Sequence, residues 1–484
     1  MRKGLTLKLN RISRVFSPGV FACLFAALVT IPLLFLTPIH GLADNGDFYR
    51  AMLSNGIYRL PSQHSQYLNF VVQKFGLMRY FNENNVAVFS SQSLVVKAAV
   101  VLNKLLYRRH VFDLRFLAAI YEVFFLGAVY LLTKSLVYPY RRLRSYVIAA
   151  LVVFVFADGT LTLYFNSFFA EPGMLIAVMY GFAAIMAIVH RCYQHNWPMV
   201  LLFIVSTVFL ITNKQQNALL ALSFIVAGAG LLFLAKSKSH RIAILMGLVL
   251  IVGAGGVTYK MINTEFSEVN QYQALTHGVL LETGDPSQKI AKQHLNEAYA
   301  LMRSENYYHK TFTAVKPSDS YVKQHLLKKY GTGWLIRYYA AHPKQFGQLL
   351  DLAAKDVMQT RVSAVGNYPR GSGKPAGAQS YFFTGYSTLM TNYFPHKYAF
   401  DCLLALAFIG IYSVSAWLDL KAKRPGGIIR FFLITGLMTI CVFVPIISII
   451  GDGDADLAKH LFMVPVCYNL TFLCFISDVL NKRL

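Results

Sequence analysis

Apolar runs long enough to cross a lipid bilayer recur from one end of this chain to the other. A membrane-spanning helix needs about 20 mostly apolar residues, and the first such run covers Phe21–Ile39. The 484 residues are 56% hydrophobic and only 14% charged, whereas about 25% of the residues in soluble proteins are charged. The sequence therefore predicts an all-α polytopic membrane protein.

The apolar runs predict about ten membrane-spanning helices. We expect them near residues 19–39, 114–134, 145–163, 173–190, 198–213, 218–235, 241–259, 398–418, 428–450 and 461–478.

The net charge of +24 is explained by this topology. Lys and Arg gather between the runs, and every strong cluster falls on the same predicted side of the membrane. These clusters are Arg2–Arg14, Lys134–Arg144, Arg191, Lys236–Arg241, Lys421–Arg424 and Lys482–Arg483. Because cytoplasmic loops are enriched in Lys and Arg, both termini are expected in the cytoplasm. The lipid bilayer, and not a nucleic acid, is the expected partner of these charges.

The predicted spans divide the chain into three parts. Residues 1–259 form an N-terminal transmembrane bundle whose acidic first outer loop covers 40–110. Residues 260–396 form an extracytoplasmic domain, and residues 397–484 hold the C-terminal spans. The first run is expected to remain as a span, because its apolar core is longer than the 7–15 residues typical of a cleaved secretory signal.

Helical periodicity continues outside the spans. Apolar residues recur three and four positions apart at 290–302, 321–330 and 334–357, which predicts a mostly helical outer domain. The Gly- and Pro-rich segment 366–383 is expected to be irregular. An amphipathic run at 94–107 is expected to lie on the membrane surface. Glu122, inside the second span, is expected to face the bundle interior and bond a neighbouring helix, with an approach to a ligand as the alternative.

Acidic and cationic residues gather where the spans reach the outer side. The first group is in GLADNGDFYRAM at Gly41–Met52, directly after the first run. A helical bundle brings such ends together, so these side chains are expected to share one cavity. They are Asp44, Asp47, Asp158, Glu171, Lys214, Gln215, Asp452, Asp454, Asp456, Lys459 and His460.

These residue types suit a transfer reaction at a phosphate. A carboxylate can act as a general base toward a hydroxyl or hold a divalent cation such as Mg or Mn. Lys214, Lys459 and His460 can bind a donor phosphate. Glu171, Gln215, Asp452, Asp454 and Asp456 are candidates for binding substrate or a cation. The plainer alternative is that these acids are solvated at the interface, and Asp in GDGD also favours turns.

The motifs DNGDFYR, YFNSFFAEP, NKQQN and GDGDADLAKHLF resemble those of the GT-C superfamily of integral membrane glycosyltransferases. More narrowly, they are similar to bacterial surface-glycan hexose transferases of the WsfD-like type. The resemblance implies an inverting transfer of a sugar, a hexose, from a polyprenyl-phosphate donor. It also implies a glycan or lipid-linked glycan acceptor, and a site on the periplasmic or extracellular side of the bacterial cytoplasmic membrane.

In that superfamily an acid of the first outer loop is the catalytic base, which here means Asp47 or Asp44. Many members have adjacent acids, whereas Asn45 and Gly46 separate the two here. Tyr49 and Arg50 beside Asp47 favour Asp47, and a deeper position would favour Asp44. The rival classes are a transporter or glycolipid flippase, whose polar groups lie nearer the midplane, and a non-catalytic membrane scaffold.

Overall fold

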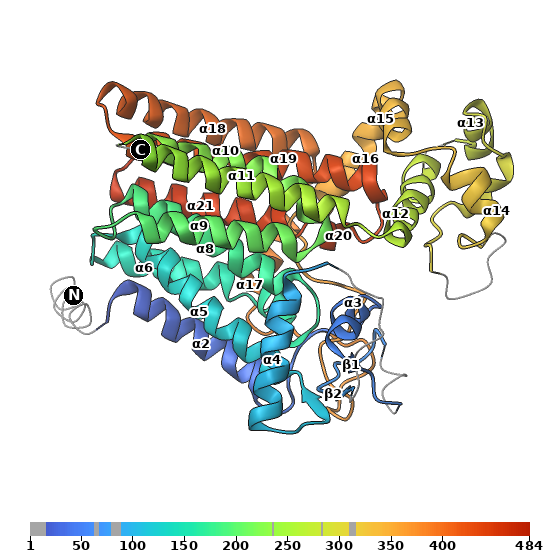
Figure 1. Cartoon of the computed structure of the whole chain (residues 1–484), viewed down its shortest axis with the longest axis horizontal. Helices are drawn as coiled ribbons and strands as arrows, with labels where there is room; N and C mark the ends of the chain where they lie inside the picture. The colour runs from blue at the N-terminus through green and yellow to red at the C-terminus, as the bar shows by residue number, and fades with distance from the viewer. Residues whose placement is uncertain (1–15, 62–66, 79–88, 235–236, 282–283, 309–315) are drawn as a thin grey trace.

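A bundle of long apolar helices forms most of the molecule, and a group of shorter helices extends from one end of it (Figure 1). The computed structural model describes residues 16–61, 67–78, 89–234, 237–281, 284–308 and 316–484. The basic cluster Arg2–Arg14 and Lys236 lie outside the described residues. We call the end of the bundle that bears the short helices the domain end, and the other end the basic end.

The predicted spans each coincide with an apolar helix. Eight described helices are long and apolar enough to cross a membrane, or nine if the bent pair at Leu143–Phe156 and Gly159–Asn166 counts as one span, and Trp197–Asn213 is a shorter apolar helix. The chain is therefore a multi-pass membrane protein. The helices are α2 (Pro18–Phe35), α5 (Arg115–Val137), α6 (Leu143–Phe156), α7 (Gly159–Thr162) with η3 (Leu163–Asn166), α8 (Glu171–Val189), α9 (Trp197–Asn213), η4 (Gln215–Leu219) with α10 (Leu220–Ala229) and η5 (Gly230–Leu234), α11 (Lys238–Lys260), α18 (Tyr398–Lys421), α19 (Pro425–Asp452) and α21 (Met463–Asn481).

Burial separates central from peripheral helices. In α8 89% of the most apolar window is buried, against 33% in α11 and 22% in α18. Helix α8 therefore lies at the centre of the bundle, and the apolar residues left exposed on α11 and α18 suit contact with lipid. One carboxylate oxygen of Glu122, Oε1, accepts a hydrogen bond of 2.6 Å from Thr30 of α2, which links the buried acid to a neighbouring helix.

The first loop is more ordered than its sequence predicts. It contains α3 (Phe48–Met52), η1 (Leu53–Asn55), the amphipathic α4 (Gln92–Leu106) and a three-stranded antiparallel sheet of β1 (Ile57–Tyr58), β2 (Lys74–Leu77) and β3 (Val111–Asp113). Strands of two to four residues are too short to show an alternating pattern, so no strand is predicted here. Together α3, α4 and the sheet cover the domain end beside α2 (Figure 1).

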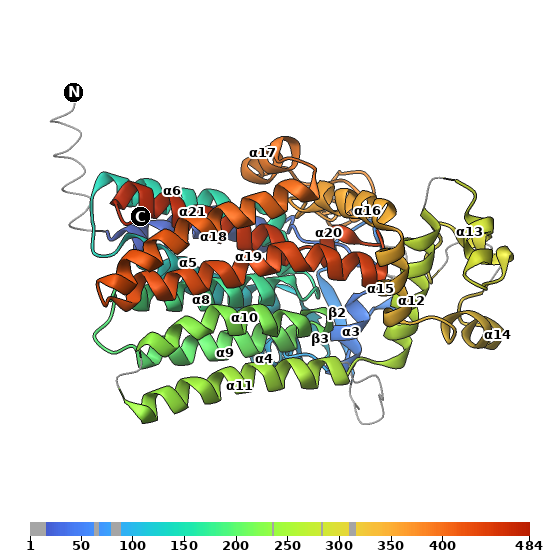
Figure 2. The same cartoon turned by 90° about the horizontal axis from the view of Figure 1, so that it is seen from above.

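The segment between α11 and α18 is mostly helical. Its elements are α12 (Thr264–Thr276), η6 (Val279–Leu281), α13 (Pro286–Lys292), η7 (Glu297–Met302), α14 (Ser320–Val322), η8 (Lys323–Leu327), α15 (Thr332–Ala341), α16 (Pro343–Asp356) and α17 (Gly385–Tyr393). The single helix expected at 334–357 is two helices, because Pro343 begins α16 and lacks the N–H that a continuous helix needs. The stretch 366–383 has no helix, as predicted. Helix α17 lies along the bundle near α6 (Figure 2).

Candidate active site

The first loop uses its two aspartates differently. Asp44 is only 7% exposed, and its Oδ1 accepts hydrogen bonds from the backbone N–H groups of Gly46 (2.7 Å) and Phe48 (3.3 Å). Its other oxygen forms an ion pair with Arg59. All of these contacts fold the loop back on itself. Asp44 is therefore engaged in shaping the loop before α3.

Asp47 precedes α3 and points toward the turn between α19 and α21. Its carboxylate forms ion pairs with Lys459, on the short helix α20 (Leu457–His460), and with Arg50 at 3.3 Å. Burial raises the pKa of Asp47, but the positive charges of Lys459 and Arg50 outweigh burial and hold the pKa well below its usual range. Burial lowers the pKa of Lys459, but the negative charges of Asp47, Asp456 and Glu171 together outweigh burial and raise it. Both groups are ionised at neutral pH.

A second ion pair joins the start of α8 to the end of α9. Lys214 Nζ lies 2.9 Å from Glu171 Oε1, and the Glu171 side chain is 1% exposed. Next to it, Asn213 donates a hydrogen bond of 2.7 Å to the carbonyl of Ala170. A Cβ added at Gly173 would lie 3.0 Å from Asn213 Nδ2, so glycine there leaves room for this contact.

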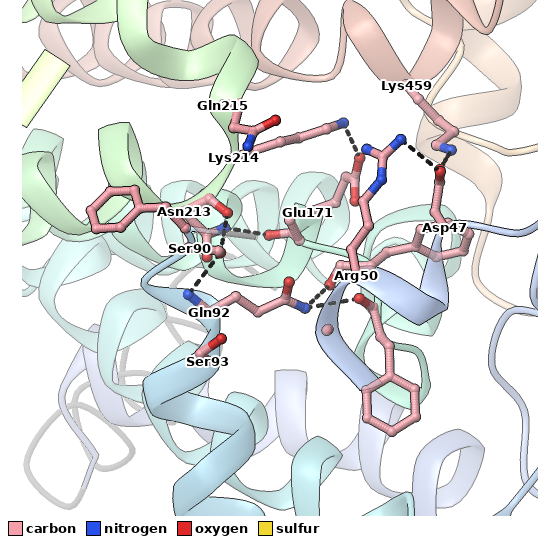
Figure 3. A pocket seen from close by; sticks show the side chains of 15 residues that line it. Asp47, Arg50, Ser90, Gln92, Ser93, Glu171, Asn213, Lys214, Gln215 and Lys459 are labelled. Carbon is pink, nitrogen blue, oxygen red and sulfur yellow. Dashed lines mark hydrogen bonds and ion pairs between the residues drawn. The ribbon is translucent and has the colours of Figure 1, made fainter. Parts of the chain in front are cut away.

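These two ion pairs line one cavity of about 60 Å³ (Figure 3). Asp47, Glu171, Lys214, Gln215 and Lys459 were predicted from the sequence, and the structure brings them together. Arg50, noted in the sequence only as a neighbour of Asp47, also lines the cavity. The residues that the sequence did not single out are Ala51, Phe89, Ser90, Gln92, Ser93, Phe168, Phe169, Ala170 and Asn213. Asn213 belongs to the quoted NKQQN motif and Phe168–Ala170 to YFNSFFAEP, so the motifs did hold a signal for them.

Three buried polar atoms of cavity residues have no hydrogen-bond partner within the described parts of the chain. They are Asn213 Oδ1, Gln215 Nε2 and Arg50 Nε. Unpaired buried polar atoms are costly, so these three atoms are available to hydrogen-bond a polar ligand in the cavity. Gln92 differs, because its amide donates to the carbonyls of Phe168 (2.9 Å) and Phe169 (2.8 Å) and thereby fixes the cavity wall.

The remaining predicted site residues lie outside this cavity. His460 Nε2 is 3.0 Å from Asp452, and Asp454 is 2.7 Å from His277 Nδ1 at the end of α12. The Asp456 side chain is 64% exposed. Asp452, Asp454 and His460 thus join the turn after α19 to its neighbours. Asp44 is likewise absent from the cavity lining.

Asp158 lies in a separate buried cluster. Its carboxylate accepts hydrogen bonds from the backbone N–H and hydroxyl of Thr160 (2.9 and 2.8 Å) and of Ser387 (3.0 and 2.9 Å). Ser387 belongs to α17 and Thr160 to α7. Asp158 therefore fastens α17 to the bundle.

The two carboxylates of the cavity are paired with lysines. Across the ranges that the structure describes, no three or more His, Cys, Asp and Glu side chains are grouped so that they could hold a metal ion. Asp47 and Glu171 each bind a lysine instead. The Mg or Mn ion stays a prediction, and no step below depends on it.

The fold and the cavity together define a class: an all-α, multi-pass membrane protein with paired acids and lysines in a cavity at the domain end of its bundle. The chain belongs to the family described as YfdI N-terminal transmembrane domain, whose profile matches residues 5–484. No curated protein matches it.

Solved structures give a more distant likeness. The apo oligosaccharyltransferase of Archaeoglobus fulgidus is 12% identical, with a TM-score of 0.37, over 96% of this chain and 50% of that one. The same enzyme tethered to an acceptor peptide is 11% identical to this chain, with a TM-score of 0.38. AglB from that organism, in complex with an inhibitory peptide and a dolichol-phosphate, is 12% identical, with a TM-score of 0.35. Both matches cover 96% of this chain and 50% of the other. The chain spans about half the length of these structures. A likeness this distant carries neither substrate nor site.

Proposed function

We propose that this protein is a GT-C glycosyltransferase. It transfers a hexose from a polyprenyl-phosphate donor to a surface glycan or a lipid-linked glycan, and the configuration at the anomeric carbon is inverted. The reaction takes place on the outer face of the bacterial cytoplasmic membrane. The WsfD-like resemblance of the sequence motifs supports the hexose and the surface glycan.

The observation that carries this proposal is the meeting of Asp47 with Lys459 and Lys214 in one cavity. A glycosyl transfer from a lipid phosphate needs a base for the acceptor hydroxyl and cations for the departing phosphate. Both kinds of group are present within the cavity. Asp44 is held by the backbone of its own loop and by Arg59. Asp47 is therefore our choice for the base.

The small size of the cavity implies that its ion pairs rearrange. A volume of about 60 Å³ holds a few water molecules and is too small for a hexose. The donor phosphate attracts the ammonium groups of Lys459 and Lys214, which then separate from Asp47 and Glu171. Asp47 loses the charge that lowers its pKa and becomes a stronger base. The base is thus activated only when the donor is bound.

The proposed step moves one proton and one sugar. Asp47 takes the proton of the acceptor hydroxyl, whose oxygen forms a bond to the anomeric carbon. The bond between that carbon and the phosphate oxygen breaks on the opposite face, so the configuration inverts. The polyprenyl phosphate leaves with the bonding electrons, and Lys459 and Lys214 stabilise its added negative charge.

The distribution of basic residues supports an outer location of the cavity. Arg141, Arg191, Arg241 and Arg424 lie in connections or helix starts at the basic end, opposite the cavity (Figure 1). Lys and Arg are enriched on the cytoplasmic side of membrane proteins. The domain end is then periplasmic or extracellular.

Turnover of a polyprenyl-phosphate hexose by the purified protein tests the function. We expect Asp47→Asn to lower kcat by about 10²-fold or more, because a general base typically accelerates a reaction by about 10²-fold to 10⁴-fold. Glu297→Gln is the control, since Glu297 is an exposed acid of the outer helices, and it should keep wild-type turnover. Near-normal kcat in Asp47→Asn would remove Asp47 from the mechanism. Transport of the glycolipid with no transfer would favour the flippase instead.

A further inference from the structure

A second and much larger cavity opens at the basic end, far from Asp47. Its volume is about 800 Å³, and it lies between the end of α8, the α8–α9 connection, η5 and the junction of α18 with α19. Cavities of roughly 300–1,000 Å³ are typical of small-molecule sites. The proposed glycosyl transfer does not use this cavity.

The cavity combines an apolar wall with two arginines. Ile188, Phe233 and Ile429 belong to the wall, while Arg191 and Arg424 also line it. A Cβ added at Gly230 would lie 2.9 Å from the Cα of Ile429, so η5 and α19 are in backbone contact beside this wall. An apolar surface next to a pair of guanidinium groups suits an amphiphile with a negatively charged head.

Both arginines lack a protein partner. No ion pair or side-chain hydrogen bond joins Arg191 or Arg424 to any residue in the described part of the chain. By contrast, Arg483 at the same end donates a hydrogen bond of 2.8 Å to the carbonyl of Leu136, as expected of an arginine that caps the end of a helix. The side chains of Arg191 and Arg424 make no capping bond of this kind, although Arg424 occupies the N-cap position of α19.

The backbone at Arg191 turns the chain sharply out of helix α8. Arg191 has φ of 54°, in the left-handed region that glycine usually occupies at the end of a helix. A long charged side chain here is less favourable than glycine, and such strain is common at ligand sites. The turn directs the chain from α8 into the loop that forms the rim of the cavity.

The charge balance favours a ligand with one negative charge. Asp419 is the acid in the cavity lining, and its Oδ2 accepts a hydrogen bond of 2.7 Å from the backbone of Gly427. Arg191 and Arg424 with Asp419 leave one net positive charge. Tyr138 and Tyr193 also line the cavity, and tyrosines are enriched where helices meet the membrane surface.

We propose that this cavity binds an anionic phospholipid. The phosphodiester lies against Arg191 and Arg424, and the acyl chains follow Phe233 and Ile429 into the bilayer. A phospholipid with a single negative charge, such as phosphatidylglycerol, neutralises the site. The inference is independent of the glycosyl transfer.

Native mass spectrometry of the full-length protein in detergent tests this site. Phosphatidylglycerol and phosphatidylcholine are offered in equal amounts to the wild type and to the double variant Arg191→Gln/Arg424→Gln. We expect the wild type to retain phosphatidylglycerol preferentially, and the double variant to retain about 10-fold less of it. Unchanged melting temperatures without added lipid would show that the variant is folded.

The matched control is Lys238→Gln/Arg241→Gln, which removes two exposed cations at the same end but outside the cavity lining. It should retain phosphatidylglycerol as the wild type does. Equal losses in both double variants would overturn the proposal, because they would indicate a general attraction to basic loops. Equal retention of phosphatidylcholine, or displacement by inorganic phosphate alone, would also overturn it.

Discussion

Each acid of the first loop has a role that its neighbours determine. In the sequence, Tyr49 and Arg50 favour Asp47 as the base and a deeper position would favour Asp44, so local features alone do not decide between them. The difference arises from Lys459, which is 412 residues away from Asp47 in the chain. A sequence pattern cannot report such a contact, and for the same reason Gln92, which bonds the carbonyls of Phe168 and Phe169, was not predicted. The cluster of polar ends did predict Asp47, Glu171, Lys214, Gln215 and Lys459 as site residues.

Replacing Lys459 is expected to shift the pH dependence of the reaction. The charge of Lys459 lowers the pKa of Asp47, and burial opposes it, so Lys459→Gln should raise that pKa. The acidic limb of kcat/KM against pH, which reports groups of the free enzyme, should then move to higher pH. Binding of the donor should also weaken. Lys344→Gln, at an exposed lysine of α16, is the control, and an unmoved limb in Lys459→Gln would contradict the ion-pair exchange.

The long apolar helices could be predicted because a run of about 20 apolar residues has few possible structures other than a membrane-spanning helix. The short elements could not. Strands β1 to β3 lack a readable alternation, and α12 was missed because TEFSEVNQYQALT contains few apolar residues. The break at Pro343 was present in the sequence, but the helical period on both sides concealed it. What remained beyond prediction is how α17 and the 357–384 segment return to the bundle, since those contacts are long-range.

The attachment of α17 should depend on the Asp158 cluster. Asp158→Asn places an amide NH₂ among groups that already donate, so one or more buried donors lose their acceptor. We expect a loss of stability of about 1–3 kcal/mol, measured by thermal or denaturant unfolding, with earlier proteolysis near α17. Ser387→Ala removes one hydroxyl donor and leaves the backbone bond, so its effect should be smaller. Equal stability of Asp158→Asn and wild type would mean that other contacts hold α17.

The molecule as a whole separates two kinds of chemistry between the ends of its bundle. The cavity with paired acids and lysines lies at the domain end, and the unpaired arginines of the larger cavity lie at the basic end. The positive-inside rule supports the proposed orientation in the membrane, and labelling from one side tests it. Gly331 suits such a label, because a Cβ added there meets no atom within 4 Å.

In a variant that lacks the half-buried Cys23 and Cys402, we expect Gly331→Cys to react in intact cells with a membrane-impermeant maleimide. His195→Cys, in the exposed α8–α9 connection at the basic end, should react only after the membrane is permeabilised. The reverse pattern would put Asp47 in the cytoplasm, where nucleotide-activated sugars are present and a lipid-phosphate donor is not required. Reaction of Gly331→Cys in intact cells would instead place Asp47 on the outer side of the membrane. The sugar donor there must be a lipid that crosses the membrane before it reacts.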